Sequence, residues 1–251
     1  SYIISQYPET DSENCFLPPY RCFPLVPLPI LLPKESPFEK VIHYICQQKH
    51  PKMIPDIFLP NLEDVKKAEE VLKSIVKETP LQESKELSAK LGANVYYKCE
   101  NLQKTGSFKI RGACNKISNL TDEEKAKGVI ASSAGNHAQG VALGAKMTGI
   151  KATIVMPETA PLAKVTATKS YGAEVVLNGA VYDDAYAKAV EIQKETGATF
   201  LHPFDDEYVI AGQGTIGLEI FKQLNENVDT ILCPIGGGGI IAGIAVAAKG
   251  L

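Results

Sequence analysis

Residues 61–251 predict an α/β fold in which helices wrap a mostly parallel sheet. A cassette recurs four times: a helical stretch ends at glycine, one small or apolar residue follows, and a short apolar run begins. Glycine suits the left-handed cap at a helix end, and uninterrupted apolar runs suit strands that are buried on both faces. Strands that alternate with helices in this way favour parallel pairing. The cassettes start at Gly92, Gly149, Gly172 and Gly197.

The first 60 residues predict a poorly ordered, proline-rich tail. They hold eleven of the sixteen prolines, and proline supports neither helix interiors nor strand pairing. The apolar run from Phe23 to Leu32 is interrupted by three prolines and is too short for a membrane helix. It also lacks the basic start and the small-residue cleavage site of a signal peptide.

The folded part is expected to begin at Asn61, which can cap a helix with acidic residues in its first turn. Further helices are predicted where Thr121 and Glu124 have the spacing of a capping box, where Pro161 opens a first turn, and over residues 181–196. The apolar positions of the first helix are Leu62, Val65, Leu72, Ile75 and Val76.

Composition argues against several classes of partner. With 26 basic and 29 acidic residues, the chain offers no predicted surface for nucleic acid or for a membrane. The six cysteines include no CxxC pair and no metal-ligand spacing with the four histidines. Free thiols, a cytoplasmic location and no metal site are therefore expected.

Three motifs carry the chemistry. Lys109 lies in Ser107–Gly112, where a polar run turns into a predicted helix, and such a lysine can form a Schiff base. Residues 132–140 read SSAGNHAQG after a predicted strand, and residues 234–240 read PIGGGGI after another. Four glycines before a helix leave backbone N–H groups open to a phosphate. No Walker lysine follows, but Gly237-x-Gly239-x-x-Ala242 also fits a relaxed dinucleotide pattern, so a nicotinamide-dependent oxidoreductase stays an alternative.

Together, in this order, the three motifs resemble those of the serine/threonine dehydratases among the fold type II pyridoxal-phosphate enzymes, and most closely the short catabolic threonine ammonia-lyases. The resemblance runs from about Asn61 to Leu251 and implies the tryptophan synthase β-like fold. It implies a large domain from residues 61–103 and 201–251, incomplete at its C-terminus, and a small inserted domain over about 104–200. It also implies a homo-oligomer, a dimer or a tetramer.

The resemblance assigns roles to particular residues. Lys109 would form the Schiff base and later act as the general base, Phe108 would lie against the cofactor, and Asn136 would bind its 3′ oxygen. The phosphate would lie on Gly236, Gly237, Gly238, Gly239 and Ile240. The substrate carboxylate would lie on the segment Ser133, Ala134, Gly135, Asn136 and His137. The His137 side chain itself is interpreted as structural.

The implied reaction is β-elimination from L-threonine to 2-oxobutanoate and ammonia, with L-serine to pyruvate as a side activity. It would serve amino acid catabolism or isoleucine biosynthesis. Racemases of the resembled family have a serine at position 134, and Ala134 has no exchangeable proton, so a dehydratase is preferred to a racemase. A serine racemase-like enzyme and an inactive, truncated cofactor-binding fragment remain alternatives.

Overall fold

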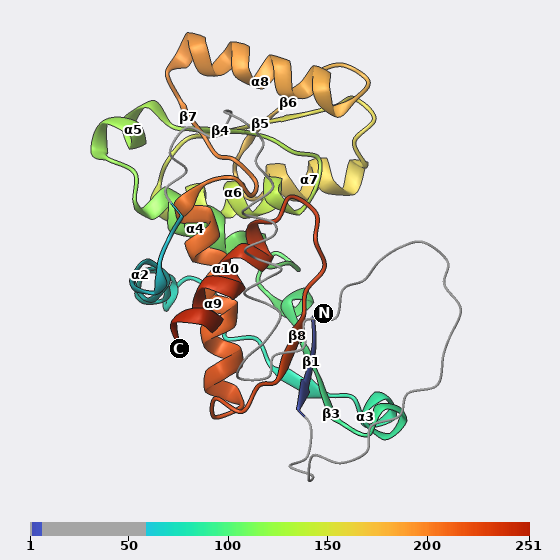
Figure 1. Cartoon of the computed structure of the whole chain (residues 1–251). Helices are drawn as coiled ribbons and strands as arrows, with labels where there is room; N and C mark the ends of the chain where they lie inside the picture. Colours follow the sequence, from blue (N-terminus) through green and yellow to red (C-terminus); the bar gives the residue numbers. More distant parts are fainter. Residues whose placement is uncertain (1, 7–58) are drawn as a thin grey trace, which may run out of the picture.

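The computed structural model describes residues 2–6 and 59–251 (Figure 1). The described strands are β1 (Tyr2–Gln6), β2 (Leu81–Glu83), β3 (Asn94–Lys98), β4 (Val129–Ser132), β5 (Ala152–Met156), β6 (Glu174–Leu177), β7 (Thr199–Phe200) and β8 (Thr230–Leu232). The described helices are α2 (Leu62–Leu72), α3 (Lys85–Leu91), the 3₁₀ helix η1 (Glu100–Leu102), α4 (Lys109–Ser118), α5 (Asp122–Lys127), α6 (Asn136–Thr148), α7 (Leu162–Ser170), α8 (Tyr182–Thr196), α9 (Glu207–Gln223) and α10 (Gly239–Gly250).

One sheet is parallel throughout, as predicted, with the strand order β6-β5-β4-β7. Its strands all fall within residues 104–200, the range expected for the inserted domain. Successive side chains of a strand point to opposite faces. Ile130 and Val155 accordingly pack with the alanines of α8, whereas Ile154 and Met156 belong to the core that includes α6. Figure 1 shows α8 on one side of this sheet and α6 on the other.

The other sheet differs from the expectation of parallel strands. Its order is β2-β3-β1-β8, and each neighbouring pair is antiparallel. The reason is the insertion of β1: it runs opposite to both β3 and β8, so these two strands point in the same direction without pairing. Residues 2–6, within the segment 1–60 that was predicted to be a tail, form β1. Residues 1 and 7–58 lie outside the described part of the chain.

The predicted helix ends are found where the local chemistry placed them. The side chain of Asn61 accepts hydrogen bonds from the backbone at the start of α2, and Thr121 and Glu124 form the expected capping box of α5. Gly92, Gly149 and Gly197 each adopt the left-handed conformation after a helix. These caps stop each helix and send the chain into the next strand.

Helices α4, α9 and α10 meet through backbone contacts at glycines. A Cβ atom on Gly243 of α10 would lie 2.3 Å from the carbonyl oxygen of Ile210 and 2.5 Å from the backbone nitrogen of Gly214, both on α9. On the other side of α9, a Cβ atom on Gly212 would lie 2.7 Å from the carbonyl oxygen of Arg111 on α4. No side chain separates the helices at these points, so their spacing is fixed by the backbone.

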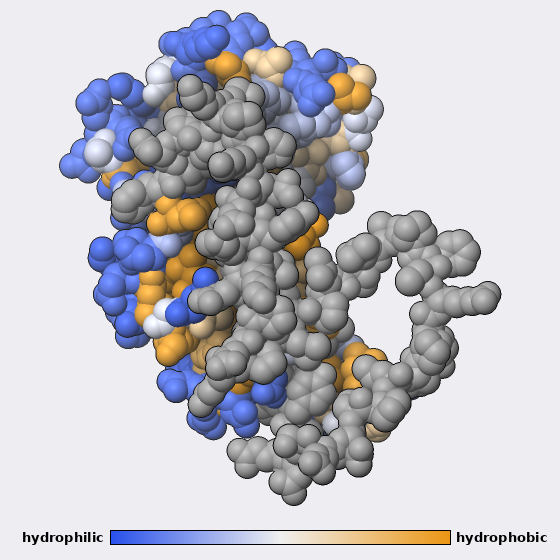
Figure 2. All heavy atoms as spheres, in the orientation of Figure 1, coloured by the Kyte–Doolittle hydropathy of each residue, from blue (hydrophilic) through white to orange (hydrophobic). Residues whose placement is uncertain are grey.

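The hydropathy of the surface differs between two regions in the view of Figure 2. Hydrophilic residues dominate around α5 and α8, while hydrophobic residues gather lower on this face, in the region of α10. The sequence of α10 explains this, because it is apolar on nearly all sides although only the side toward α9 and α2 is buried. No helix among the described residues is both long and apolar enough to span a bilayer.

Candidate cofactor-binding site

Lys109 is the first residue of α4, and its amine lies in a half-buried position without an acidic partner. The Nζ atom donates a hydrogen bond to the carbonyl oxygen of Pro203 at 2.7 Å and lies 5.3 Å from the ring centre of Phe108. No ion pair of Lys109 occurs among the described residues. Burial lowers the pKa of this amine, because the charged form loses solvation. The amine is thus suited to act as a neutral nucleophile or base.

The asparagine segment lies where β4 ends and α6 begins. The Oγ atom of Ser133 accepts a hydrogen bond from the backbone of Gly135 at 3.2 Å, which closes the turn before the helix. Asn136 is the first residue of α6, and its Oδ1 atom accepts a hydrogen bond from Lys164 at 3.0 Å. The first-turn N–H groups of α6 have no partners within the helix and can bind an anion.

The side chain of His137 lies in the interior and hydrogen-bonds to the backbone of another segment. The imidazole is buried, and its Nε2 atom donates a hydrogen bond to the carbonyl oxygen of Leu201 at 2.9 Å. Burial lowers the pKa of His137 to about 4, so the ring is neutral at physiological pH. Its Nδ1 atom has no hydrogen-bond partner among residues 2–6 and 59–251.

The glycine segment forms a tight turn before α10, and part of this turn faces open space. Gly238 has a φ of +87°, a conformation that side chains resist, and it caps the helix that begins at Gly239. A Cβ atom on Gly237 would lie 2.2 Å from the ring of Phe204, whereas Gly236 and Gly238 face open space. Bare N–H groups at the start of a 12-residue helix fit a phosphate group.

The loop of residues 201–206 connects all three motifs. The carbonyl oxygen of Leu201 contacts His137, that of Pro203 contacts Lys109, and Phe204 packs against Gly237. The sequence analysis missed this role. The position of the loop was a usable signal, because it follows β7, and sites in α/β folds lie beyond the carboxyl ends of parallel strands.

Direct packing also joins the motifs. Phe108 lies against a buried cluster that includes Ile240, and Gly140 of α6 rests on the backbone of Lys109, where a Cβ atom would be 3.1 Å from the carbonyl oxygen. The structure therefore brings together the three segments that the sequence singled out. These segments offer the amine of Lys109, the apolar ring of Phe108 and backbone N–H groups that can bind a phosphate. This combination fits a pyridoxal-phosphate molecule. Three described cysteines, Cys99, Cys114 and Cys233, are free.

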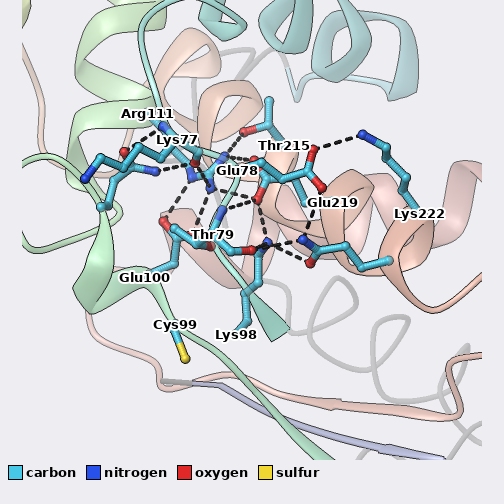
Figure 3. A network of polar contacts seen from close by, with 12 residues as sticks. Lys77, Glu78, Thr79, Lys98, Cys99, Glu100, Arg111, Thr215, Glu219 and Lys222 are labelled. Carbon is cyan, nitrogen blue, oxygen red and sulfur yellow. Dashed lines mark hydrogen bonds and ion pairs between the residues drawn. The ribbon is translucent and has the colours of Figure 1, made fainter. Parts of the chain in front are cut away.

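A buried network of ion pairs connects α4 to neighbouring elements (Figure 3). Arg111, two residues after Lys109, donates hydrogen bonds to both carboxylate oxygens of Glu100 and to both of Glu219. Lys98 pairs with Glu219 as well. All four side chains are at least nine-tenths buried, and their charges cancel. The network ties the start of α4 to η1 and α9.

Comparison with known proteins agrees with this geometry. Residues 72–251 match the family model described as "Pyridoxal-phosphate dependent enzyme". The chain therefore belongs to that family. Pyridoxal phosphate is the cofactor of this family, and the nicotinamide alternative is set aside.

Among curated relatives, the L-threonine ammonia-lyase of Thermotoga maritima is 57% identical over 190 residues, which cover 76% of this chain and 47% of the relative. The chain spans about half the length of the curated relatives it matches.

Solved structures show the same fold. Maize serine racemase superposes with a TM-score of 0.72 at 40% identity, covering 76% of this chain and 58% of that one. The T.th. threonine deaminase superposes with a TM-score of 0.68 at 44% identity, covering 76% of this chain and 61% of that one. The predicted fold type II architecture is confirmed.

Proposed function

We propose that the protein is a threonine ammonia-lyase that converts L-threonine to 2-oxobutanoate and ammonia and acts more slowly on L-serine, giving pyruvate. The observation that carries the proposal is the Lys109 amine, which is partly desolvated and has no acidic partner among the described residues. The loop that contacts this amine at Pro203 also packs against the glycine turn at Phe204. The Thermotoga maritima relative, named for this activity, supports the choice of substrate. A homo-oligomer and a cytoplasmic location belong to the same proposal.

Different residues of the chain would bind different parts of the cofactor. Lys109 would hold its aldehyde carbon as an imine, Phe108 would pack on its ring, and the amide of Asn136 would donate to its 3′ oxygen. The N–H groups of Gly236–Ile240 would bind its phosphate. When bound, pyridoxal phosphate supplies a ring that accepts the electrons left on the substrate Cα atom.

The remaining chemistry falls to Lys109 and to the segment before α6. The N–H groups of Ser133–His137 bind the substrate carboxylate and so orient its Cα–H bond. With the cofactor bound, the neutral amine of Lys109 would remove the α-proton of the substrate as a general base. The half-buried environment assists this step, because it disfavours the ammonium form of lysine.

Position 134 supports elimination over racemisation. A racemase needs a second group that returns a proton to the opposite face of Cα, and the methyl side chain of Ala134 cannot do so. Selectivity between the two substrates is expected to be modest. A pocket gains only about 1–3 kcal/mol from one extra methyl group, so L-threonine is preferred while L-serine still reacts.

The test is production of 2-oxobutanoate from L-threonine, measured with Lys109→Ala and with Lys104→Ala as the matched control. Lys104 is an exposed lysine five residues earlier. The Lys109 variant should lose about 10²- to 10⁴-fold in rate, and the Lys104 variant should keep its rate. Borohydride reduction with pyridoxal phosphate should label the peptide that contains Lys109.

Three outcomes would contradict the proposal. Undiminished turnover by Lys109→Ala would remove its central residue. Formation of D-serine from L-serine in place of 2-oxo acids would favour the racemase alternative. Labelling of Lys109 without any turnover would leave a protein that binds the cofactor without catalysis.

A further inference from the structure

The loop of residues 201–206 is organised from within by His202. The Nδ1 atom of His202 accepts a hydrogen bond from the backbone of Asp205 at 2.8 Å and a longer one from the backbone of Phe204 at 3.5 Å. The ring also packs edge-on against Phe204, with the ring centres 4.7 Å apart and an interplanar angle of 83°. Because Nδ1 accepts, the proton of the neutral ring is on Nε2.

The longer of these two bonds comes from one particular peptide unit, between Pro203 and Phe204. The carbonyl oxygen of Pro203 and the N–H of Phe204 belong to the same trans peptide unit and point in opposite directions. His202 holds the N–H side of this unit, and the carbonyl on the other side faces the Lys109 amine at 2.7 Å. Rotation of the unit would turn the carbonyl away from Lys109. The bond to His202 therefore favours the orientation in which the Pro203 carbonyl faces Lys109.

Both ends of the loop that carries this peptide unit are anchored. At the start, the carbonyl oxygen of Leu201 is bound to the buried His137. At the end, Asp206 caps α9 by accepting hydrogen bonds from its first turn, and it forms an ion pair with Lys116 at 2.8 Å. The segment between the anchors is only four residues long.

A carbonyl suits a reactive amine better than a carboxylate would. A carboxylate partner would stabilise the ammonium form, whereas the uncharged carbonyl orients the amine and lets it lose its proton more easily. The other groups that act electrostatically on this region are His137 on α6 and Asp205 and Asp206 beside His202. Neither aspartate forms an ion pair with Lys109.

We propose that His202 is a positioning residue, which holds the Pro203 carbonyl as the resting place of the free Lys109 amine. The role given to Lys109 rests on the proposed function. In that reaction the amine would act as the general base, so this long and flexible side chain must stay within reach of the α-proton. Docking on a fixed carbonyl keeps it there. His202 acts through the loop and does not touch the substrate.

Three substitutions separate positioning from simple packing. His202→Asn keeps an acceptor close to the place of Nδ1, His202→Gln moves the polar atoms to the place of Nε2, and His202→Leu removes them. Asparagine can accept from backbone N–H groups two and three residues on, as in an Asx turn. All three variants lose the ring that packs on Phe204, and only His202→Asn keeps an acceptor at the Nδ1 position.

The measurement is competitive labelling of the full chain with acetic anhydride, without cofactor, over a range of pH values. Mass spectrometry of the peptide that contains Lys109 gives the titration midpoint of the amine and its labelling rate on the alkaline plateau. In His202→Leu and His202→Gln the amine should swing toward water. Its plateau rate should rise about two- to tenfold, the equivalent of one lost hydrogen bond, and its midpoint should move upward. His202→Asn should match the unsubstituted chain.

Thermal melting of each variant reports whether the fold is intact, and if His202→Leu does not fold, the Asn and Gln variants still decide. Equal labelling of Lys109 in His202→Gln and in the unsubstituted chain would overturn the proposal, as would an Asn variant that behaves like the Gln variant. The labelling needs neither cofactor nor substrate. It can therefore succeed even if Lys109→Ala retains lyase activity, and it can fail while the lyase assignment stands.

Discussion

Replacing Arg111 by methionine tests how strongly the buried network holds α4. The substitution keeps a long side chain but removes the cation that contacts Glu100 and Glu219 with four hydrogen bonds between 2.6 and 3.0 Å. Lys98 remains beside Glu219, so two carboxylates then share one buried cation. Thr215 also loses its contact with the guanidinium.

The expected loss follows from this charge imbalance. Removing one partner of a buried ion pair costs about 3–5 kcal/mol, because the remaining charge stays without solvation. A typical domain is stable by about 5–15 kcal/mol, so a large share of the total disappears. With a urea dependence of about 2 kcal/mol per molar, the unfolding midpoint should fall by about 2 M.

Urea unfolding followed by circular dichroism measures this shift, and the double variant Arg111→Met with Glu100→Gln is the matched control. In the double variant Lys98 and Glu219 form a neutral pair, and the amide oxygen introduced at position 100 can still accept the hydrogen bond from Thr79. About half of the lost stability should return. The reasoning is refuted if the single variant shifts the midpoint by less than about 0.5 M, or if the double variant is no more stable than the single one.

Two further predictions concern His137 and the helix contact at Gly243. The pKa of His137 is about 4 in the folded chain, below its ordinary value of 6.5, so the unfolded state binds more protons between these values and stability falls as pH drops through this window. This loss of stability is about 3 kcal/mol. His137→Gln can still donate a hydrogen bond to Leu201, and the urea midpoint of this variant should lack this part of the pH dependence. If the urea midpoint depends on pH identically in the variant and the unsubstituted chain, the buried neutral ring is contradicted. Gly243→Ala should lower stability by about 1–3 kcal/mol, because its Cβ atom meets backbone atoms of α9 that cannot move aside, and an unchanged melting temperature would show that the helices can separate.

Local signals in the sequence were sufficient for most elements of the described chain. The capping residues Asn61 and Thr121 and the glycines that end helices act within a few residues of their own position, so their consequences can be read without the fold. The parallel sheet followed from the same signals. The three motifs also located the segments that meet at the candidate site.

Long-range pairings could not be predicted in this way. The role of Arg111 could not be read from the sequence, because its partner Glu219 is 108 positions away and no spacing rule links the two. The pairing of β1 with β3 and β8 was missed because proline content dominates the first 60 residues. The role of the 201–206 loop rests on backbone carbonyls, which leave no trace in the choice of side chains.

The backbone contacts of α9 have a consequence for how the site can change. This one helix touches α4 at Gly212 and α10 at Gly214, and it contributes Glu219 to the ion network. The two ends of the candidate cofactor site, at Lys109 and at the glycine segment, are therefore both positioned by α9. A substitution that shifts α9 carries both ends along together, so the distance between them is protected.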